Sequence, residues 1–215
     1  MKKILKFINK VSFGKTINFL YFLLKINSKI KVRTVLKNKC VVKLEIGSGK
    51  KKGSGDWLTL DINHVSDLCW DLRNGIPFPN ASVSMIYSSH LFEHLTYKEI
   101  SKLLSECHRV LIPDGVFSIC VPDARKYIIA YIKNDDSFWN SQSSFYEPAN
   151  NIISRIDYVN YIAYMGGVHK YMFDEENLVG ILKTSGFRNV CLRDFNQDVD
   201  MIERAGESIY AECLK

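Results

Sequence analysis

A glycine turn between two short apolar segments most constrains what this chain can fold into. Residues 41–44 and 57–60 are apolar runs of the kind that form buried parallel strands. The first run leads into Gly47-Ser48-Gly49, where glycine permits a positive φ and leaves no side chain in the way of a ligand. The second run ends at Asp61, whose carboxylate can accept two hydrogen bonds from a ribose diol. A Gly-x-Gly turn alone is weak evidence for a ligand site. Between two apolar runs and ahead of Asp61, however, it predicts an α/β fold with a nucleotide-like ligand at the carboxyl ends of its strands.

Further apolar segments after this turn predict the rest of the sheet. We expect strands near residues 67–72, 83–88 and 116–121, and two more at 190–195 and 208–214 that pair as a hairpin at one edge. Thr96 and Glu99 form a capping box that begins a helix, and Asp174 caps a later one.

One long segment, residues 124–168, fits none of these elements. We interpret it as an insert that covers the substrate above the carboxyl ends of the strands. The alternative is a partly helical insert with no role in ligand binding.

Positive charge is concentrated at the start of the chain. The net charge is +6, yet the first 40 residues hold eleven Lys or Arg and no Asp or Glu, and the rest holds 18 basic and 23 acidic residues. Apolar residues at Ile4, Phe7, Ile8 and Val11 have helical spacing. We therefore expect residues 1–38 to form a basic amphipathic extension ahead of a domain at 39–215. Either residues 1–35 lie on an anionic membrane surface, or these helices pack against the domain.

Composition also bears on other partners and on the compartment. Lysines interrupt every apolar stretch of the extension, so no transmembrane span fits. The extension lacks the interleaved aromatic and Arg residues that bind nucleic acid, so nucleic acid is not an expected partner. Six scattered cysteines form no Cys-x-x-Cys pair and are typical of small core residues in a reducing compartment. These features predict a cytoplasmic protein, with peripheral contact at the inner membrane face as the one membrane association that fits.

Four motifs, in order along the chain, resemble those of class I S-adenosylmethionine-dependent methyltransferases. They are residues 44–49 (LEIGSG), 71–80 (DLRNGIPFPN), 85–95 (MIYSSHLFEHL) and 108–115 (HRVLIPDG), and the likeness extends to 167–173 (GVHKYMF) and 207–212 (ESIYAE). The resemblance implies a Rossmann-like, mainly parallel seven-stranded sheet with an antiparallel edge hairpin and helices on both faces. It also implies S-adenosylmethionine as the cofactor. The likeness is closest to small members associated with surface-polysaccharide and glycan modification.

The same resemblance implies roles for individual residues. Glu45, Gly47 and Gly49 would border the methionine part of the cofactor, and Asp61 would bind its ribose. Asp71 and Leu72 would contact the adenine, and Ser88 and Ser89 would lie beside the sulfonium. The full implied set of cofactor-binding residues is Glu45, Gly47, Ser48, Gly49, Asp61, Ile62, Asp71, Leu72, Ser88 and Ser89. The ligand's ammonium and sulfonium favour a carboxylate at Glu45, whereas a dinucleotide places a pyrophosphate over this turn. Only residues 50–56 separate the turn from the next strand, too few for an ordinary crossover helix.

Two departures from the family pattern keep other functions open. Lys51 occupies the position of the third glycine, and Ser84 occupies that of an acidic residue before the fourth strand. Residues 50–52 are all lysine and could attract a phosphate, so a nucleotide- or nucleotide-sugar-using Rossmann enzyme is one alternative. A non-catalytic S-adenosylmethionine-binding module at a membrane is another.

Methyl transfer to a hydroxyl requires alignment of acceptor and sulfonium and removal of a proton. The candidates for this work are His90, His169 and Asp123, each of which also has a structural interpretation. His90 and His94 are four residues apart but lack the full spacing of a known zinc motif, so we predict no metal. We expect methyl transfer to a hydroxyl or amine of a small molecule, a sugar or glycan intermediate of surface-polysaccharide synthesis.

Overall fold

Within the residues that the computed structural model describes (23–38, 42–143 and 153–215), seven strands form one sheet. The order across the sheet is β3-β2-β1-β4-β5-β7-β6. The strands are β1 (Lys43–Ile46), β2 (Trp57–Asp61), β3 (Leu68–Cys69), β4 (Val83–Ser89), β5 (Leu111–Pro122), β6 (Arg188–Leu192) and β7 (Ser208–Leu214). The first five are parallel, and β7 lies antiparallel to both β5 and β6. The predicted Rossmann-like sheet with an antiparallel edge hairpin is confirmed.

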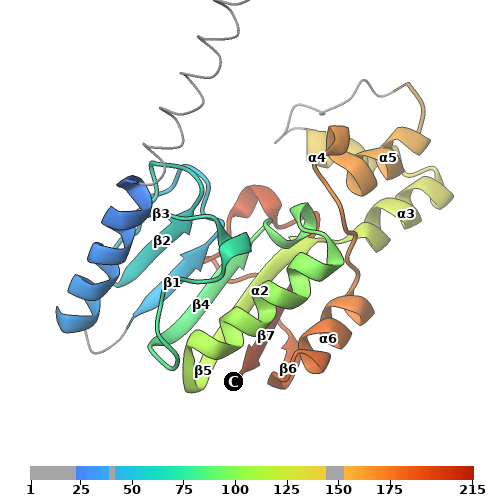
Figure 1. The fold of residues 1–215 in the computed structure, drawn as a ribbon. Coiled ribbons are helices and arrows are strands. Elements are labelled where there is room, and N and C mark those ends of the chain that lie inside the picture. Colours follow the sequence, from blue (N-terminus) through green and yellow to red (C-terminus); the bar gives the residue numbers. More distant parts are fainter. Residues whose placement is uncertain (1–22, 39–41, 144–152) are drawn as a thin grey trace, which may run out of the picture.

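Helices lie around this sheet (Figure 1). One covers the described residues 23–38. The others are α2 (Tyr97–Val110), α3 (Ala124–Lys133), α4 (Asp136–Ser143), α5 (Ile156–Tyr164) and α6 (Glu175–Thr184), with short 3-10 turns η1 (Leu72–Asn74), η2 (Phe92–His94), η3 (Met165–Gly167) and η4 (Ile202–Arg204). As expected, Thr96 and Glu99 form the capping box of α2, and Asp174 caps α6.

Three predicted strand boundaries are wrong. The third strand, predicted near residues 67–72, covers only Leu68–Cys69, because Asp71 already caps η1. The fifth begins at Leu111, directly after α2, and Pro113, Asp114 and Gly115 lie inside β5, where its register with β4 shifts. The last hairpin begins earlier than predicted, and β6 ends before Arg193, whose side chain bonds to Asp200.

The segment 124–168 is mainly helical in its described part, with α3, α4 and α5 followed by η3. These helices lie beyond the carboxyl ends of the parallel strands (Figure 1). Tyr127, Trp139, Tyr158 and Tyr161 pack together in a small core separate from the main one. Because this aromatic cluster packs the helices against each other, the segment is a subdomain beside the sheet.

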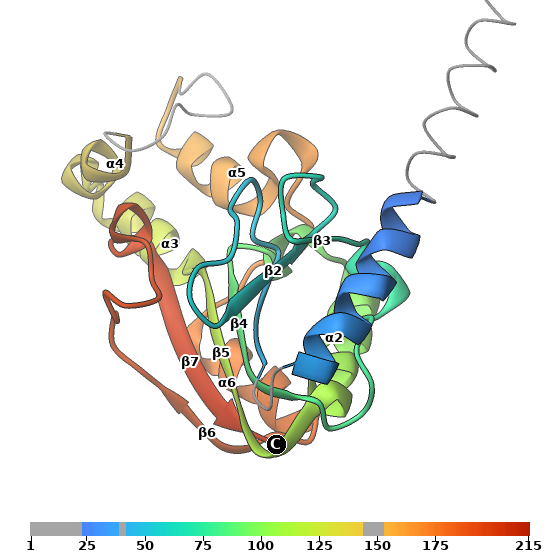
Figure 2. The ribbon, with the colours of Figure 1, turned by 90° about the vertical axis from the view of Figure 1, so that its left-hand side faces the viewer.

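The sheet has one deeply buried face. Leu44, Ile86, Phe117 and Cys213 are neighbours in register across four strands, and each is at most 1% exposed. They belong to one apolar cluster with the core residues of α2 and α6 and with Val32 of the helix over 23–38. Figure 2 shows this helix and α2 on the same side of the sheet.

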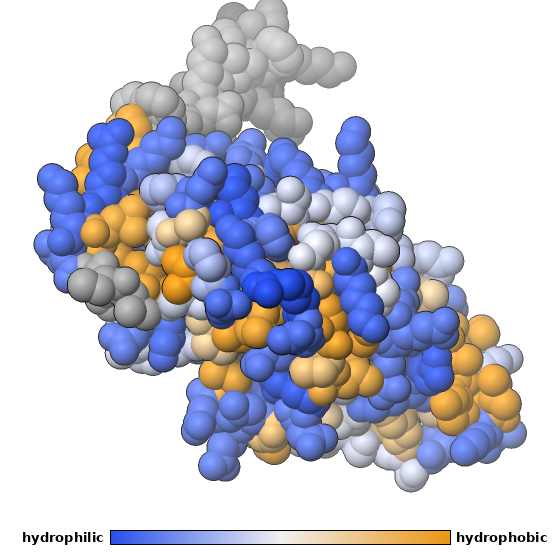
Figure 3. Space-filling view, turned by 90° about the horizontal axis from the view of Figure 1, so that it is seen from below, coloured by the Kyte–Doolittle hydropathy of each residue, from blue (hydrophilic) through white to orange (hydrophobic). Residues whose placement is uncertain are grey.

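The neighbouring row of residues points to the opposite face. Lys43, Met85, Val116 and Leu214 are in register across the same strands, and all four are only half-buried. At this row the second face is therefore more open than the first, whereas Tyr87 and Ser118, two residues further along the same face, are buried. Seen from the amino ends of the parallel strands, apolar side chains are interspersed among hydrophilic ones (Figure 3).

The basic helix over 23–38 packs against the edge of the sheet. Ser28 is buried and its hydroxyl donates to the carbonyl of Cys69 at 3.1 Å, while Lys31 donates to the carbonyl of Asp67 at 3.0 Å. In this part of the chain, the contacts are those of the second alternative, packing against the domain. Residues 1–22, which carry the first predicted amphipathic stretch, lie outside the described residues.

Candidate active site

The glycine turn after β1 has the backbone geometry that its sequence predicts. Gly47 and Gly49 have φ values of 72° and 63°. A Cβ at Gly47 would lie 2.7 Å from the Cβ of Leu91, so that position requires glycine for space as well as for conformation. A Cβ at Gly49 would meet nothing within 4 Å, so the backbone there faces open space that a ligand can occupy.

Asp61, at the end of β2, is held against this turn. One carboxylate oxygen accepts from the backbone N–H of Gly49 at 2.9 Å, and the other accepts from Asn63 at 2.8 Å. The carboxylate therefore stabilises the turn and keeps lone pairs for the diol of a ribose. This arrangement joins the ends of two adjacent strands through a single side chain.

A cavity of about 680 Å³ opens at the carboxyl ends of the strands. Its lining includes the predicted residues Glu45, Gly47, Ser48, Gly49, Asp61, Ser89 and His90. A second cavity of about 190 Å³ adjoins it through Asp61, Leu91 and His94. Asp61, Ile62, Asp71 and Leu72 line this smaller cavity, as expected for the adenine side. The structure thus brings nine of the ten predicted cofactor residues to two adjoining cavities, and Ser88 is fully buried beneath them.

Asp71 has a strong local partner in addition to its predicted ligand. Arg73 donates to its two carboxylate oxygens through Nε and Nη2, both at 2.9 Å. This hydrogen-bonded guanidinium lowers the pKa of Asp71. The backbone N–H of Arg73 also donates to Oδ1 at 3.0 Å. The carboxylate is therefore charged and fixed in place, with one lone pair of Oδ2 left for an exocyclic amine.

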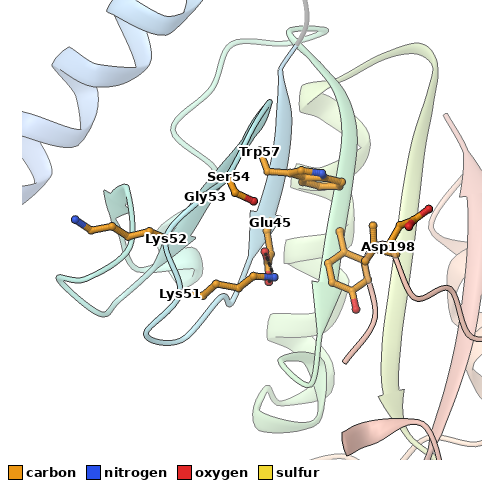
Figure 4. A pocket seen from close by; sticks show the side chains of 9 residues that line it. Glu45, Lys51, Lys52, Gly53, Ser54, Trp57 and Asp198 are labelled. Atoms are coloured by element: carbon orange, nitrogen blue, oxygen red, sulfur yellow. Dashed lines mark hydrogen bonds and ion pairs between the residues drawn. The ribbon is translucent and has the colours of Figure 1, made fainter. Parts of the chain in front are cut away.

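Lys51, at the position where a third glycine was expected, forms an ion pair with Glu45. Its Nζ lies 3.0 Å from one carboxylate oxygen and 3.2 Å from the other. Figure 4 shows the two side chains reaching toward each other beside Trp57 and Asp198. The Lys51 side chain is 52% exposed, so it can leave Glu45 when another cation arrives.

The turn and its surroundings fit the cofactor that the sequence implies. The hydroxyl of Ser48 lines the large cavity, and the hydroxyl of Ser88 lies below it. Neither has a hydrogen-bond partner among the described residues, although both are buried. Together with the carboxylates of Glu45 and Asp61, the Ser48 hydroxyl at the cavity offers acceptors for the ammonium and ribose of S-adenosylmethionine.

His90 follows β4 at the wall of the large cavity. Its φ is 51°, an uncommon backbone conformation for a residue other than glycine. Its Nε2 lies 2.8 Å from the hydroxyl of Ser208 on β7. Burial, with the nearby charge of Arg204, holds the pKa of His90 well below its usual range, so the ring is neutral near pH 7.

The other two predicted catalytic residues lie away from the cavity lining. His169 is 7% exposed, and its Nδ1 lies 2.8 Å from the carbonyl of Ile162. Asp123 caps α3 by accepting from the backbone N–H of Arg125, and burial raises its pKa. Of the two interpretations weighed for Asp123, the observed contact is the cap.

Two charged residues at the site were not singled out by the sequence patterns. Arg204 lines the large cavity and donates to the carbonyl and hydroxyl oxygens of Ser89. Glu93 is 2% exposed, and burial raises its pKa to about 8. Glu93 lies in η2, shortly after β4 and within a quoted motif, whereas Arg204 ends η4, in a segment that no sequence motif marks.

The loop that carries Arg204 is fixed by a buried polar network. Asp200 accepts from two Arg193 nitrogens at 2.6 and 2.8 Å and from the hydroxyl of Tyr87 at 2.9 Å. Arg193 also donates to Ser118 at 3.0 Å. The network ties the segment before β7 to Tyr87 on β4 and Ser118 on β5.

Comparisons with known proteins agree with this site. Residues 44–119 match a family described as "Methyltransferase domain". A probable S-adenosylmethionine-dependent methyltransferase from Mycolicibacterium smegmatis is 39% identical over 57 residues, which cover 25% of this chain and 21% of that protein. The match therefore spans about a fifth of that relative's length.

Solved structures with a similar fold include two S-adenosylmethionine-dependent methyltransferases. The one from Archaeoglobus fulgidus has a TM-score of 0.50 at 16% identity and covers 89% of this chain and 94% of its own. The one from Mesorhizobium loti has the same score and identity over 81% and 90%. At these identities the two structures show the fold alone. The match at residues 44–119 and the relative from Mycolicibacterium smegmatis are what support an enzyme that uses S-adenosylmethionine as its methyl donor.

Proposed function

We propose that this chain transfers a methyl group from S-adenosylmethionine to a hydroxyl or amine of a small molecule, a sugar or glycan intermediate of surface-polysaccharide synthesis. The observation that carries the proposal is one cavity bordered by the glycine turn, Asp61 and His90. Cofactor-binding and acceptor-side groups thus come from the ends of three adjacent strands. Ligands bind at this edge of open α/β sheets.

The chain's own residues account for the demands of the reaction. When bound, S-adenosylmethionine supplies an activated methyl group that an acceptor oxygen or nitrogen displaces in line. Glu45 binds the ammonium of the cofactor, and Asp61 orients its ribose. His90 is the proposed proton acceptor, because its neutral ring lies at the cavity wall and Ser208 orients it. His169 and Asp123 stay predictions, with contacts to the protein itself.

The charge of the acceptor side favours an anionic substrate. Arg204 and Lys50 both line the large cavity. Arg204 donates to Ser89 through Nη1 alone, and Lys50 is exposed, so both cations can reach a ligand in the cavity. Phosphate and carboxylate groups match a guanidinium well. A phosphorylated sugar, as in nucleotide-linked or lipid-linked glycan precursors, fits this charge better than a neutral sugar does.

Calorimetry separates the proposal from a nucleotide-using enzyme. We expect S-adenosylhomocysteine to bind with 1:1 stoichiometry, and NAD and nucleotide sugars not to compete for its site. Binding of NAD in place of S-adenosylhomocysteine would contradict the methyltransferase.

Mass spectrometry of lipid-linked and nucleotide sugars, with active protein and with Asp61→Ala, then identifies the acceptor by the gain of one methyl group. Cofactor binding without methylation of any pool would instead favour the non-catalytic module.

We further propose that the basic extension contacts an anionic membrane surface, which places the enzyme on the cytoplasmic side. On the helix over 23–38, Leu23, Ile26 and Ile30 are 44%, 41% and 55% exposed. They share one helical face, at spacings of three and four residues, and lysines flank them. In the described part of the chain, no helix combines the length and the apolar character that crossing a membrane requires.

Vesicle sedimentation tests the membrane contact. Vesicles with anionic lipid should bind the whole chain, and neutral vesicles should not. Deletion of residues 1–22 leaves the packed helix in place, and Ile26→Ser with Ile30→Ser removes its exposed apolar stripe. Both changes should weaken binding, while Ile112→Ser, a comparably exposed apolar site elsewhere, should not. Equal sedimentation of all variants would rule the contact out.

A further inference from the structure

We propose that Glu93, His94 and His169 form a binding site for a divalent transition-metal ion beside the cavity. Glu93 and His94 belong to η2, directly after β4, and His169 follows η3. One ligand atom from each residue lies within 4.8 Å of the others. Sequence spacing does not reveal this site, because His169 lies 75 residues after His94. The prediction of no metal rests on the spacing of His90 and His94 alone.

Both imidazole rings have the orientation that metal ligands adopt. Nδ1 of His94 lies 3.2 Å from the carbonyl of Val168, and Nδ1 of His169 lies 2.8 Å from the carbonyl of Ile162. A carbonyl can only accept, so each Nδ1 carries the proton and each Nε2 keeps a lone pair. Donation of the second ring nitrogen to a carbonyl is the usual outer contact of a metal-binding histidine.

The carboxylate of Glu93 supplies an independent observation. Its side chain is 3% exposed, and Oε2 has no hydrogen-bond partner among the described residues. Oε1 lies 3.8 Å from Nε2 of His94, longer than a hydrogen bond. A buried carboxylate oxygen without a partner is costly, and a cation between it and the two Nε2 atoms would satisfy all three groups.

The distances permit an ion after small side-chain rotations. Three ligands bound tetrahedrally at about 2.1 Å lie roughly 3.4 Å from one another. The segment that carries His169 is already fixed to η2, because the backbone N–H groups of Lys170 and Tyr171 donate to the carbonyl of Glu93 at 2.8 and 3.2 Å. Two imidazoles and one carboxylate favour Zn²⁺ or another first-row ion over Mg²⁺ or Ca²⁺.

Three protein ligands leave room for a further ligand. His94 lines the large cavity, so a bound ion would face the side where we expect the acceptor. An acceptor oxygen or a water molecule can complete its coordination. This last step rests on the proposed function, whereas the metal site itself does not.

Metal content and direct titration test the site without any need for turnover. The untagged full chain, purified without chelators, should contain close to one equivalent of metal by mass spectrometry. After removal of that metal, isothermal titration with Zn²⁺ should show one site, and Co²⁺ should give the visible absorption of a low-symmetry site. Glu93→Gln, His94→Gln and His169→Gln should each weaken Zn²⁺ binding by at least about 100-fold.

His64→Gln is the matched control, since His64 is an exposed histidine outside the cluster. His94 is the most exposed of the three ligands, so its variant keeps the test valid if a buried substitution impairs folding, which circular dichroism reports. Absence of 1:1 binding, or unchanged affinity in folded His94→Gln, would overturn the proposal. Binding of S-adenosylhomocysteine, measured on the same samples, decides separately whether the methyltransferase assignment fails.

Discussion

The two sides of the large cavity, which we propose for the cofactor and for the acceptor, are built in different ways. On the cofactor side, backbone turns and two carboxylates come from consecutive strand ends, and Asp61 bonds to Gly49 across only 12 residues of sequence. On the acceptor side, His90 meets Ser208 and Arg204 meets Ser89 across separations of 118 and 115 residues. Local sequence therefore determines the cofactor side, whereas the packing of distant segments determines the acceptor side.

The largest expected effect is on stability, and it comes from removing Asp200, which holds the segment that carries Arg204. Asp200→Ala leaves Arg193 without its buried partner, and we expect a loss of about 3 kcal/mol in the free energy of unfolding. Urea unfolding measures it, with exposed Asp194→Ala as the control. In the folded variant, the affinity for S-adenosylhomocysteine should change little. A loss of cofactor affinity equal to that of Asp61→Ala would show that the two sides are not independent.

The same residue gives the acceptor side a dependence on pH. Burial on its own raises the pKa of Asp200, but hydrogen bonds from Arg193, Asn196 and Tyr87 outweigh it and lower the pKa. A lowered pKa in the folded state means that the stability from Asp200 is complete above its unfolded value of about 3.9. It is lost as the pH falls through the folded value. The difference in unfolding free energy between the protein and Asp200→Ala should therefore shrink below pH 4.

On the cofactor side, Asp61→Ala should weaken S-adenosylhomocysteine binding by about 100-fold, because it removes charged hydrogen bonds to both the turn and the ribose. Calorimetry measures the change, and Asp61→Asn, which keeps one acceptor, should lose less. Glu176→Ala, an exposed acid on α6, is the control for net charge. If Asp61→Ala binds normally, the cofactor does not lie on this turn.

Sequence was sufficient for the cofactor side because each feature there follows from neighbouring residues. Gly47 and Gly49 dictate the turn, and Asp61 lies one strand later. Sequence failed for Arg204 because the loop before β7 has no helix or strand period and is positioned through Asp200. Sequence also does not show that Glu93 lies close to His169, because the position of His169 depends on where η3 ends. The aromatic core of α3 to α5 does not follow from the sequence, because Asn and Ser interrupt the apolar pattern of this segment.

A smaller effect is expected at Arg204, which tests the acceptor side without disturbing the fold. Arg204→Gln should lower kcat/KM for an anionic acceptor by about 10-fold through loss of one charged contact. Its affinity for S-adenosylhomocysteine should stay within about 2-fold. Steady-state kinetics on the acceptor found by mass spectrometry gives both values, and Arg188→Gln, at the opposite end of the sheet, is the control. An unchanged kcat/KM would show that the acceptor is not bound through its charge.

The smallest effect concerns Lys51, which forms an ion pair with Glu45, the carboxylate that we propose for the ammonium of the cofactor. Lys51→Ala removes the competitor for Glu45 and should tighten S-adenosylhomocysteine binding by about 3-fold at low salt. The gain should fade as salt rises, because the exposed lysine is then screened from Glu45. Lys52→Ala, the next lysine of the loop, should leave affinity unchanged. Weaker binding in Lys51→Ala would mean that Lys51 instead contacts the cofactor.

The packing of the helix over 23–38 against β3 has a consequence for self-association. β3 is the edge strand of the sheet, and Ser28 and Lys31 occupy the carbonyls of Cys69 and Asp67 there. An uncovered strand edge pairs readily with the edge of another molecule. Removing the first 38 residues to shed the basic segment would uncover this edge, so such a truncated protein should aggregate, while one that begins at residue 23 should stay dispersed.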